Sequence, residues 1–151
     1  MKTAFLKLMA IAAIALFAVQ GQGSASAAKD PIPMLQSLSQ VSDNQIQITY
    51  DRSVDVVKGM QPSNYWVQST TDAAPSGIAT LGKDDKVMPD NALTGSQVSI
   101  NPVDGQNKSF VLTFSQAIPK GQSYKLIICF VTVPGGAPYS GDNGMAVFTG
   151  K

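Results

Sequence analysis

The chain contains no histidine and no glutamate, so all ten of its acidic residues are aspartates. Without an imidazole, a Ser-His-Asp or Cys-His nucleophile, a histidine general base and a His-ligated zinc are all excluded. Two aspartates could still form a catalytic pair in which one carboxylate raises the pKa of the other. The adjacent pair Asp84-Asp85 lies in the polar run GKDDK, which is typical of a solvated loop. We therefore expect a protein that is not an enzyme and has no cofactor.

Cysteine is almost as scarce. Cys129 is the single cysteine, so an intramolecular disulfide cannot form. Its place in an apolar run favours a buried small hydrophobe, and an intermolecular disulfide is the alternative. The methionines could in principle bind Cu(I) through their thioethers, but they are scattered and have no histidine beside them. The sequence therefore predicts no metal centre of this kind.

The first 27 residues have the pattern of a secretory signal peptide. Lys2 and Lys7 supply a positive start, residues 8–19 form an apolar core, and Ala25-Ser26-Ala27 offers small residues for cleavage. The apolar core is too short to span a bilayer comfortably, which disfavours a membrane anchor. We expect a secreted or cell-surface protein with no membrane span after cleavage. A linker at 28–34 and one domain at 35–151 would follow.

Charge is also sparse in the predicted mature chain. Cleavage after residue 27 removes Lys2 and Lys7, so 11 − 2 = 9 basic residues face 10 acidic ones. This near-neutral balance provides neither a nucleic-acid footprint nor a polybasic membrane patch. It also gives little electrostatic repulsion between copies, so self-association would meet a small barrier.

What the chain does have is period-two alternation of polar and apolar residues. QIQITY at 45–50 and SFVLTF at 109–114 alternate cleanly, which predicts two strands with one buried face each. Weaker strand patterns lie near residues 35–41, 65–68, 97–100, 124–133 and 145–149. Turns rich in Pro, Gly, Asn and Asp separate them. About seven short strands at this spacing predict an all-β, Ig-like antiparallel sandwich. Residues 71–96 are the least regular part and are expected to form a long excursion with one short strand around 77–81.

The order of these segments resembles the bacterial Ig-like domains of S-layer and other surface proteins. The resemblance is carried by QIQITYDRSVD, PSNYWV, SFVLTF, AIPKGQSYKLII and SGDNGMAVFTG, and it covers nearly all of residues 35–150. Such domains commonly occur as repeats or spacers beside other modules. The resemblance implies a β-sandwich and a structural or adhesive role at the cell surface.

Tyr124 stands where the turn containing Pro119 and Gly121 enters a long apolar strand. In many Ig-like sandwiches a tyrosine at this corner packs its ring into the core and returns its hydroxyl to the backbone a few residues upstream. Because a buried hydroxyl must be hydrogen-bonded, we expect Tyr124 to be a structural pin of this kind. A ligand-binding role is the alternative.

Three features are candidate interaction sites. Ile127, Cys129 and Val131 form the other face of the Tyr124 strand, which is so apolar that a loop or another molecule should cover it. Trp66, the only tryptophan, either faces outward, where it suits sugar stacking with Tyr139 as a second platform, or packs under the excursion. Asp142 and Asn143 are weak calcium candidates in a run that equally predicts a plain turn.

Two functions from different classes follow. The first is a non-catalytic structural, adhesive or assembly subunit that associates with itself or with another envelope protein, through the Ile127 face or a sheet edge. The second is a polysaccharide-binding module that uses exposed aromatic residues. We favour the first.

Overall fold

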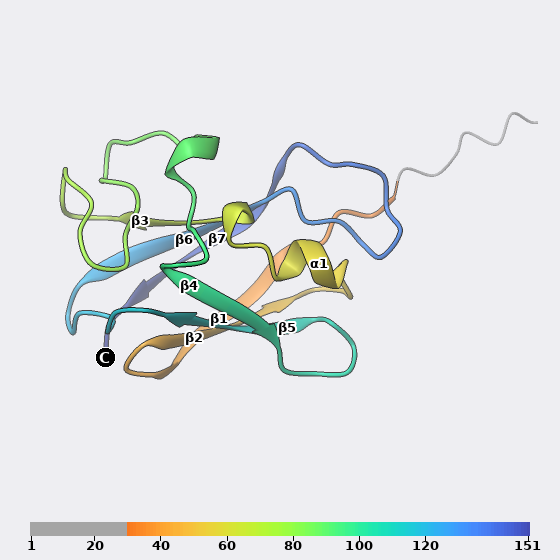
Figure 1. Ribbon diagram of the computed structural model, residues 1–151, viewed down its shortest axis with the longest axis horizontal. Helices are drawn as coiled ribbons and strands as arrows, with labels where there is room; N and C mark the ends of the chain where they lie inside the picture. The colour runs from red at the N-terminus through yellow and green to blue at the C-terminus, as the bar shows by residue number, and fades with distance from the viewer. Residues whose placement is uncertain (1–29) are drawn as a thin grey trace, which may run out of the picture.

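The computed structural model describes residues 30–151, so the predicted signal peptide lies outside the described residues. Within residues 30–151, seven strands form two antiparallel sheets that pack face to face (Figure 1). The strands are β1 Leu35–Ser42, β2 Gln45–Tyr50, β3 Tyr65–Ser69, β4 Val98–Pro102, β5 Ser109–Phe114, β6 Ser123–Cys129 and β7 Asp142–Thr149. The short helix α1 (Val56–Gly59) and the 3-10 turns η1 (Pro62–Asn64) and η2 (Pro89–Asn91) complete the elements. The predicted all-β sandwich is confirmed.

The strand order is that of the constant-type immunoglobulin sandwich. Sheet A has the order β1-β2-β5-β4, and sheet B has the order β3-β6-β7. Lettered along the chain from A to G, these are the sheets ABED and CFG. The chain crosses from sheet A to sheet B between β2 and β3 through α1, which closes one end of the sandwich (Figure 1).

The core forms where the alternating strands turn their apolar faces inward. Ile46 pairs with Leu112 and Ile48 with Phe110 across β2 and β5, and all of these side chains are buried. Polar residues on the same two strands face outward, which is the alternation the sequence predicts. From sheet B the core receives Tyr65, Val67, Tyr124, Leu126, Ile128 and Phe148.

The excursion forms an additional layer over the outer face of sheet B. Within residues 77–81 only an isolated bridge forms, between Leu81 and Gln68, so the short strand predicted there is wrong. Leu81 accepts from the backbone N–H of Ser69, and Leu93 donates to the carbonyl of Tyr65. The excursion thereby occupies the free edge of β3 as well as its outer face.

The described part of the predicted linker is held against the domain. Two hydrogen bonds join Met34 to Asp51. Met34 N donates to the Asp51 carboxylate, and Asp51 N donates to the Met34 carbonyl. The Pro33 carbonyl accepts from Asn143. Within residues 30–151 no helix is both long enough and apolar enough to cross a bilayer.

Candidate functional site

Trp66 lies inside the protein, under the excursion. Its side chain is fully buried, and its indole N–H donates to the Met88 carbonyl and to Asn91 Oδ1, at 2.9 Å each. Asn91 also accepts from Met88 N, so it holds the η2 turn and the tryptophan together. The hypothesis of an outward-facing Trp66 is wrong, and the alternative that it packs under the excursion is confirmed. The buried Trp66 therefore offers no surface for the sugar stacking that the outward-facing alternative required.

The same excursion covers Ile127 and Cys129. Both are buried in a small second core with Trp66, Leu81 and Ala92. Burial raises the pKa of the Cys129 thiol, and the nearby Asp142 adds to the effect. The prediction of a buried cysteine is confirmed, and the covering layer comes from the chain itself. The prediction that the protein associates through the Ile127 face is therefore wrong, because Ile127 and Cys129 are buried under the excursion.

Val131 does not share a face with Ile127 and Cys129. Phe130 has a left-handed φ of 68°, and the β6–β7 register shifts between Ile127 and Cys129. This break ends β6 at Cys129 and reverses the alternation. Val131 consequently packs in the main core, while Phe130 packs edge-on against Trp66 with ring centroids 6.0 Å apart. The predicted row of three residues is wrong at its last member.

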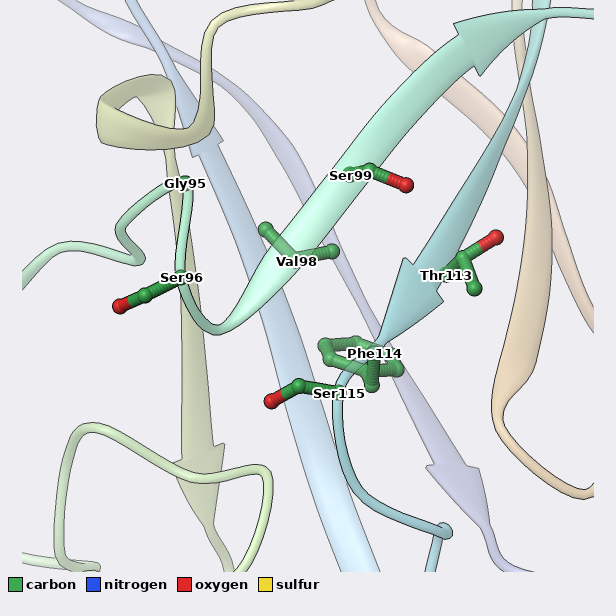
Figure 2. Close-up of a pocket in the computed structure, with 7 residues that line it drawn as sticks. All are labelled: Gly95, Ser96, Val98, Ser99, Thr113, Phe114 and Ser115. Atoms are coloured by element: carbon green, nitrogen blue, oxygen red, sulfur yellow. The ribbon is translucent and has the colours of Figure 1, made fainter.

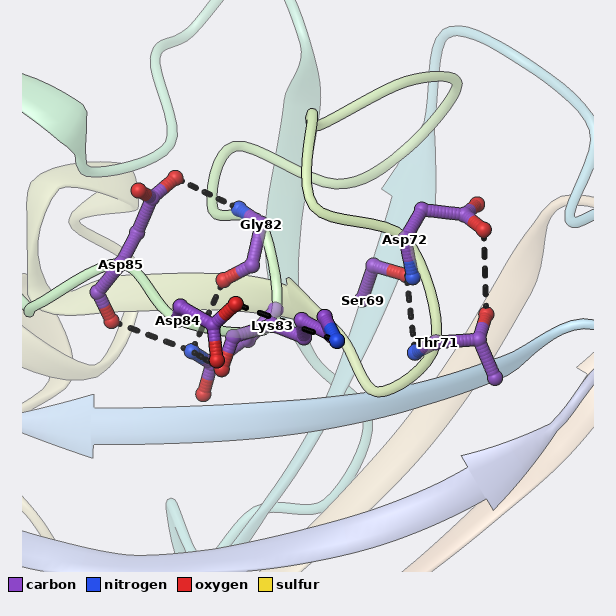
Figure 3. A network of polar contacts seen from close by, with 8 residues as sticks. Ser69, Thr71, Asp72, Gly82, Lys83, Asp84 and Asp85 are labelled. Carbon is purple, nitrogen blue, oxygen red and sulfur yellow. Dashed lines mark hydrogen bonds and ion pairs between the residues drawn. The ribbon is translucent and has the colours of Figure 1, made fainter.

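A second polar network ties the excursion to β3. Gln68 Nε2 lies 2.9 Å from the Gly82 carbonyl oxygen, and the Lys83 and Asp85 carbonyls are also within hydrogen-bond distance. Asp85 Oδ2 accepts from Gly82 N at 2.7 Å, whereas Asp84 points to solvent beside Lys83 (Figure 3). One member of the Asp84-Asp85 pair is therefore a loop-closing group. The two carboxylates are used separately.

The weak calcium candidates have separate structural roles. Asn143 is fully buried: its Oδ1 accepts from Val131 N, and its Nδ2 donates to the carbonyls of Pro33 and Val131. Asp142 is exposed and accepts from Gly144 N in a local turn. Nowhere in residues 30–151 do three His, Cys, Asp or Glu side chains group together as metal ligands would. Asn143 thus ties the segment before β1 to the β6–β7 connection.

Tyr139 is half-buried in that connection. Its hydroxyl donates to the Asp142 carbonyl at 2.8 Å, and its ring lies against Gly141, where a Cβ would meet the ring carbon Cζ at 2.6 Å. It lies in the β6–β7 loop, whereas Trp66 lies inside the domain, so the two aromatic residues do not form a common platform. The methionines Met34, Met60, Met88 and Met145 likewise lie in four separate segments, each partly exposed.

Tyr124 is buried, with its ring against Phe148 at a centroid distance of 5.7 Å. Gly121 has the positive φ of 76° expected of the turn, and Gln122 N donates to the Pro119 carbonyl. The hydroxyl of Tyr124, however, makes no hydrogen bond within residues 30–151, and it lies toward Gly77 in the excursion. The packing half of the corner prediction is confirmed. The predicted hydroxyl bond to the upstream backbone is wrong, because that hydroxyl reaches the excursion instead of the turn.

The hydroxyl that does hold upstream backbone belongs to Tyr65. Its O–H donates to the Gly59 carbonyl at 2.6 Å, and it accepts from Tyr50 at 2.7 Å. Both tyrosines are fully buried, and burial raises the pKa of each phenol. The sequence predicts that Tyr50 belongs to the buried face of the strand at 45–50, and it gives only a weaker strand pattern near Tyr65. What it did not indicate is that the two hydroxyls would meet, although two buried phenols always need partners.

The accessible part of sheet A is a polar face without charge. No residue of β1, β2, β4 or β5 is charged. The strand pairings align the outward side chains in rows across the sheet. We call this surface the polar face; it consists of Ser37, Ser39, Gln45, Gln47, Thr49, Ser99, Asn101, Ser109, Val111 and Thr113.

A shallow hollow of about 240 Å³ lies at one end of the polar face. Ser96, Ser99, Thr113 and Ser115 surround it with hydroxyl groups, and Val98 and Phe114 belong to its lining (Figure 2). No residue in this lining titrates near neutral pH. The hollow can accept hydrogen bonds from a neutral partner and offer them to it, and it has no group suited to acid–base or nucleophilic catalysis.

Among comparisons with known proteins, the one with solved structures found chains of similar fold. No protein-family model matches the chain, and no curated protein matches it. The solved structures similar to it include the S-layer protein rSbsC, at 13% identity and a TM-score of 0.52, covering 79% of this chain and 14% of that one. The N-terminal part of the bacterial S-layer protein SbsC gives 11% identity and a TM-score of 0.52, over 79% and 24%. Domains 1–6 of SbsC give 12% and 0.51, over 79% and 14%.

The chain therefore has a fold similar to part of a bacterial surface-layer protein. It spans less than two thirds of the length of each of these proteins. At this level of identity the likeness shows the fold alone.

Proposed function

We propose that this chain is a non-catalytic bacterial Ig-like domain with a structural or assembly role at the cell surface. The single observation that carries the proposal is the likeness of its seven-stranded sandwich to part of SbsC, a bacterial surface layer protein. The S-layer-like order of sequence segments points in the same direction. Adhesion and secretion through the predicted signal peptide belong to this proposal.

The polar face supports an assembly role on physical grounds. The buried centres of protein interfaces are depleted in charged residues, because desolvating a charge costs free energy that a partner must recover. A sheet surface made of Ser, Thr, Gln and Asn, with Val111 as its apolar member, can be covered without that cost. It can also be left in water without aggregating, since its groups are polar.

Locating the chain on intact cells tests the proposal. We expect an antibody or an added protease to reach the chain without lysis, and a chaotropic salt to release it from the envelope. A control cytoplasmic protein should be unreachable in the same cells. Recovery of the chain in the cytoplasmic fraction alone would contradict the proposal. The proposal that the chain is non-catalytic would be contradicted if it turned over a substrate and if replacing one of the aspartates in residues 30–151 abolished that turnover.

A further inference from the structure

The backbone of β7 has one unpaired edge. In sheet B, Gly150 N donates to Gln122 O, so the even-numbered residues Ala146 and Phe148 form the hydrogen-bonded pairs with β6. The N–H and C=O groups of Met145, Val147 and Thr149 therefore point away from β6. Within the described residues these groups make no hydrogen bond. An unpaired strand edge is a template for pairing with another chain.

The other three edges are covered or blunted. The excursion bonds to the β3 edge through Tyr65 O, Val67 O and Ser69 N. On β4, Pro102 has no N–H, and Val98 N is already bonded to Thr94. On β1, the register shifts twice, and such bulges discourage pairing. β1 runs beside β7, with Leu35 next to Gly144 at one end and Gln40 accepting from Lys151 N at the other, but within the described residues no backbone hydrogen bond joins the two strands.

The side chains along the β7 edge suit a second copy of the same strand. Met145 and Val147 are 55% and 62% exposed, and no charged residue or proline interrupts the run from Met145 to Thr149. Strands that are apolar and uncharged, with neither lysine nor proline, lack the devices that usually prevent edge pairing. In an antiparallel pair centred on Val147, that residue would face its own copy, and Met145 would face Thr149.

We propose that two copies of this chain pair antiparallel through their β7 edges, about a two-fold axis at Val147. Each unpaired N–H and C=O group of Met145, Val147 and Thr149 then finds a partner in the other copy, and the two B sheets become one continuous sheet. Because the pairing is two-fold, the same surface serves both copies. This inference rests on the proposed assembly role and names its partner.

Charge-swap variants of Val147 test the pairing by sedimentation of the purified protein. We expect the wild type to associate as its concentration rises, and Val147→Lys and Val147→Asp to be monomeric each by itself, because like charges would stand directly opposite each other. A mixture of the two variants should associate again, since opposite charges then meet. Val57→Lys is the matched control, because Val57 is 71% exposed on α1 and lies on no strand edge; it should associate like the wild type.

Amide hydrogen exchange of the wild type needs no variant and locates the interface. The amides of Met145, Val147 and Thr149 should be protected only at high concentration, whereas those of Ala146 and Phe148 should be protected at every concentration. A wild type that stays monomeric at all concentrations overturns the pairing, while detection of the chain on the cell surface would leave the proposed function standing. Association that survives both substitutions at Val147, or concentration-dependent protection elsewhere, such as at Ile100 of β4, overturns the assignment to β7.

Discussion

At the scale of single residues, Tyr65 and Tyr124 are both buried, but within the described residues only the Tyr65 hydroxyl makes hydrogen bonds. Tyr65→Phe removes a donor to the Gly59 carbonyl and an acceptor for Tyr50. Both partners would remain buried without a bond, and each such group costs about 1–3 kcal/mol. We expect Tyr65→Phe to lower the free energy of unfolding by about 2 kcal/mol or more, measured by urea denaturation.

Tyr124→Phe is the matched control for that measurement. The Tyr124 ring is also buried, but its hydroxyl makes no hydrogen bond within the described residues. Its loss should change the free energy of unfolding by no more than about 0.5 kcal/mol. If the two variants were destabilised equally, the hydroxyl bonds of Tyr65 would not be what stabilises this end of the sandwich.

At the scale of elements, Gly121 lies in the turn before β6, and Gly150, directly after β7, packs against the same turn. The two glycines are required for different reasons. A Cβ on Gly150 would overlap the Pro119 carbonyl oxygen, because the C-terminal strand end passes directly over the turn. Gly121 has open space around it and only its positive φ to maintain. Gly121→Ala should cost about 1–2 kcal/mol from the left-handed conformation alone. Gly150→Ala should cost clearly more in the same thermal-unfolding assay, and a smaller effect than that of Gly121→Ala would contradict this difference.

The excursion is an element whose attachment Trp66 reports directly, since it is the only tryptophan. We expect the native fluorescence to have the short-wavelength maximum of a buried indole and not to respond to polysaccharides. Asn91→Ala removes one acceptor of the indole N–H and the acceptor of Met88 N. This variant should make Trp66 easier to quench with acrylamide. Asn101→Ala, on the exposed polar face, is the control and should leave quenching unchanged.

Alternation and turn residues predicted the seven strands of the sandwich, because both are local properties of the sequence, whereas the strand expected in the irregular excursion at 77–81 did not form. They left open whether a loop or another molecule covers sheet B, since the excursion has no period of its own and is positioned by side-chain bonds from Trp66 and Gln68 to residues 14 to 25 positions away. The break at Phe130 is similar. A left-handed φ at a phenylalanine has no sequence signal, and here it is accompanied by the packing of its ring on Trp66. The predicted surface row of Ile127, Cys129 and Val131 was therefore wrong. The excursion covers the first two residues, and the break at Phe130 turns Val131 into the main core.

At the scale of the whole molecule, the absence of histidine and glutamate determines how stability depends on pH. No side chain of this chain has an ordinary pKa between about 5 and 8, so stability should be flat across that range. At higher pH the buried Cys129, Tyr50 and Tyr65 matter, because burial raises the pKa of each above its ordinary value. In the unfolded chain the thiol ionises near pH 8.5 and the phenols near pH 10. The folded state therefore retains protons that the unfolded state has lost.

Since the unfolded state then binds fewer protons, the free energy of unfolding must fall as pH rises. We expect it to be constant from about pH 5 to 8, to decline above about pH 9 and to decline more steeply above about pH 10, by up to about 1.4 kcal/mol per pH unit for each group. Urea denaturation at a series of pH values measures this profile. Cys129→Ala should remove the first part of the decline and leave the second, because the tyrosines remain. A profile that rises above pH 9, or that changes between pH 5 and 8, would mean that other groups govern the stability of the sandwich.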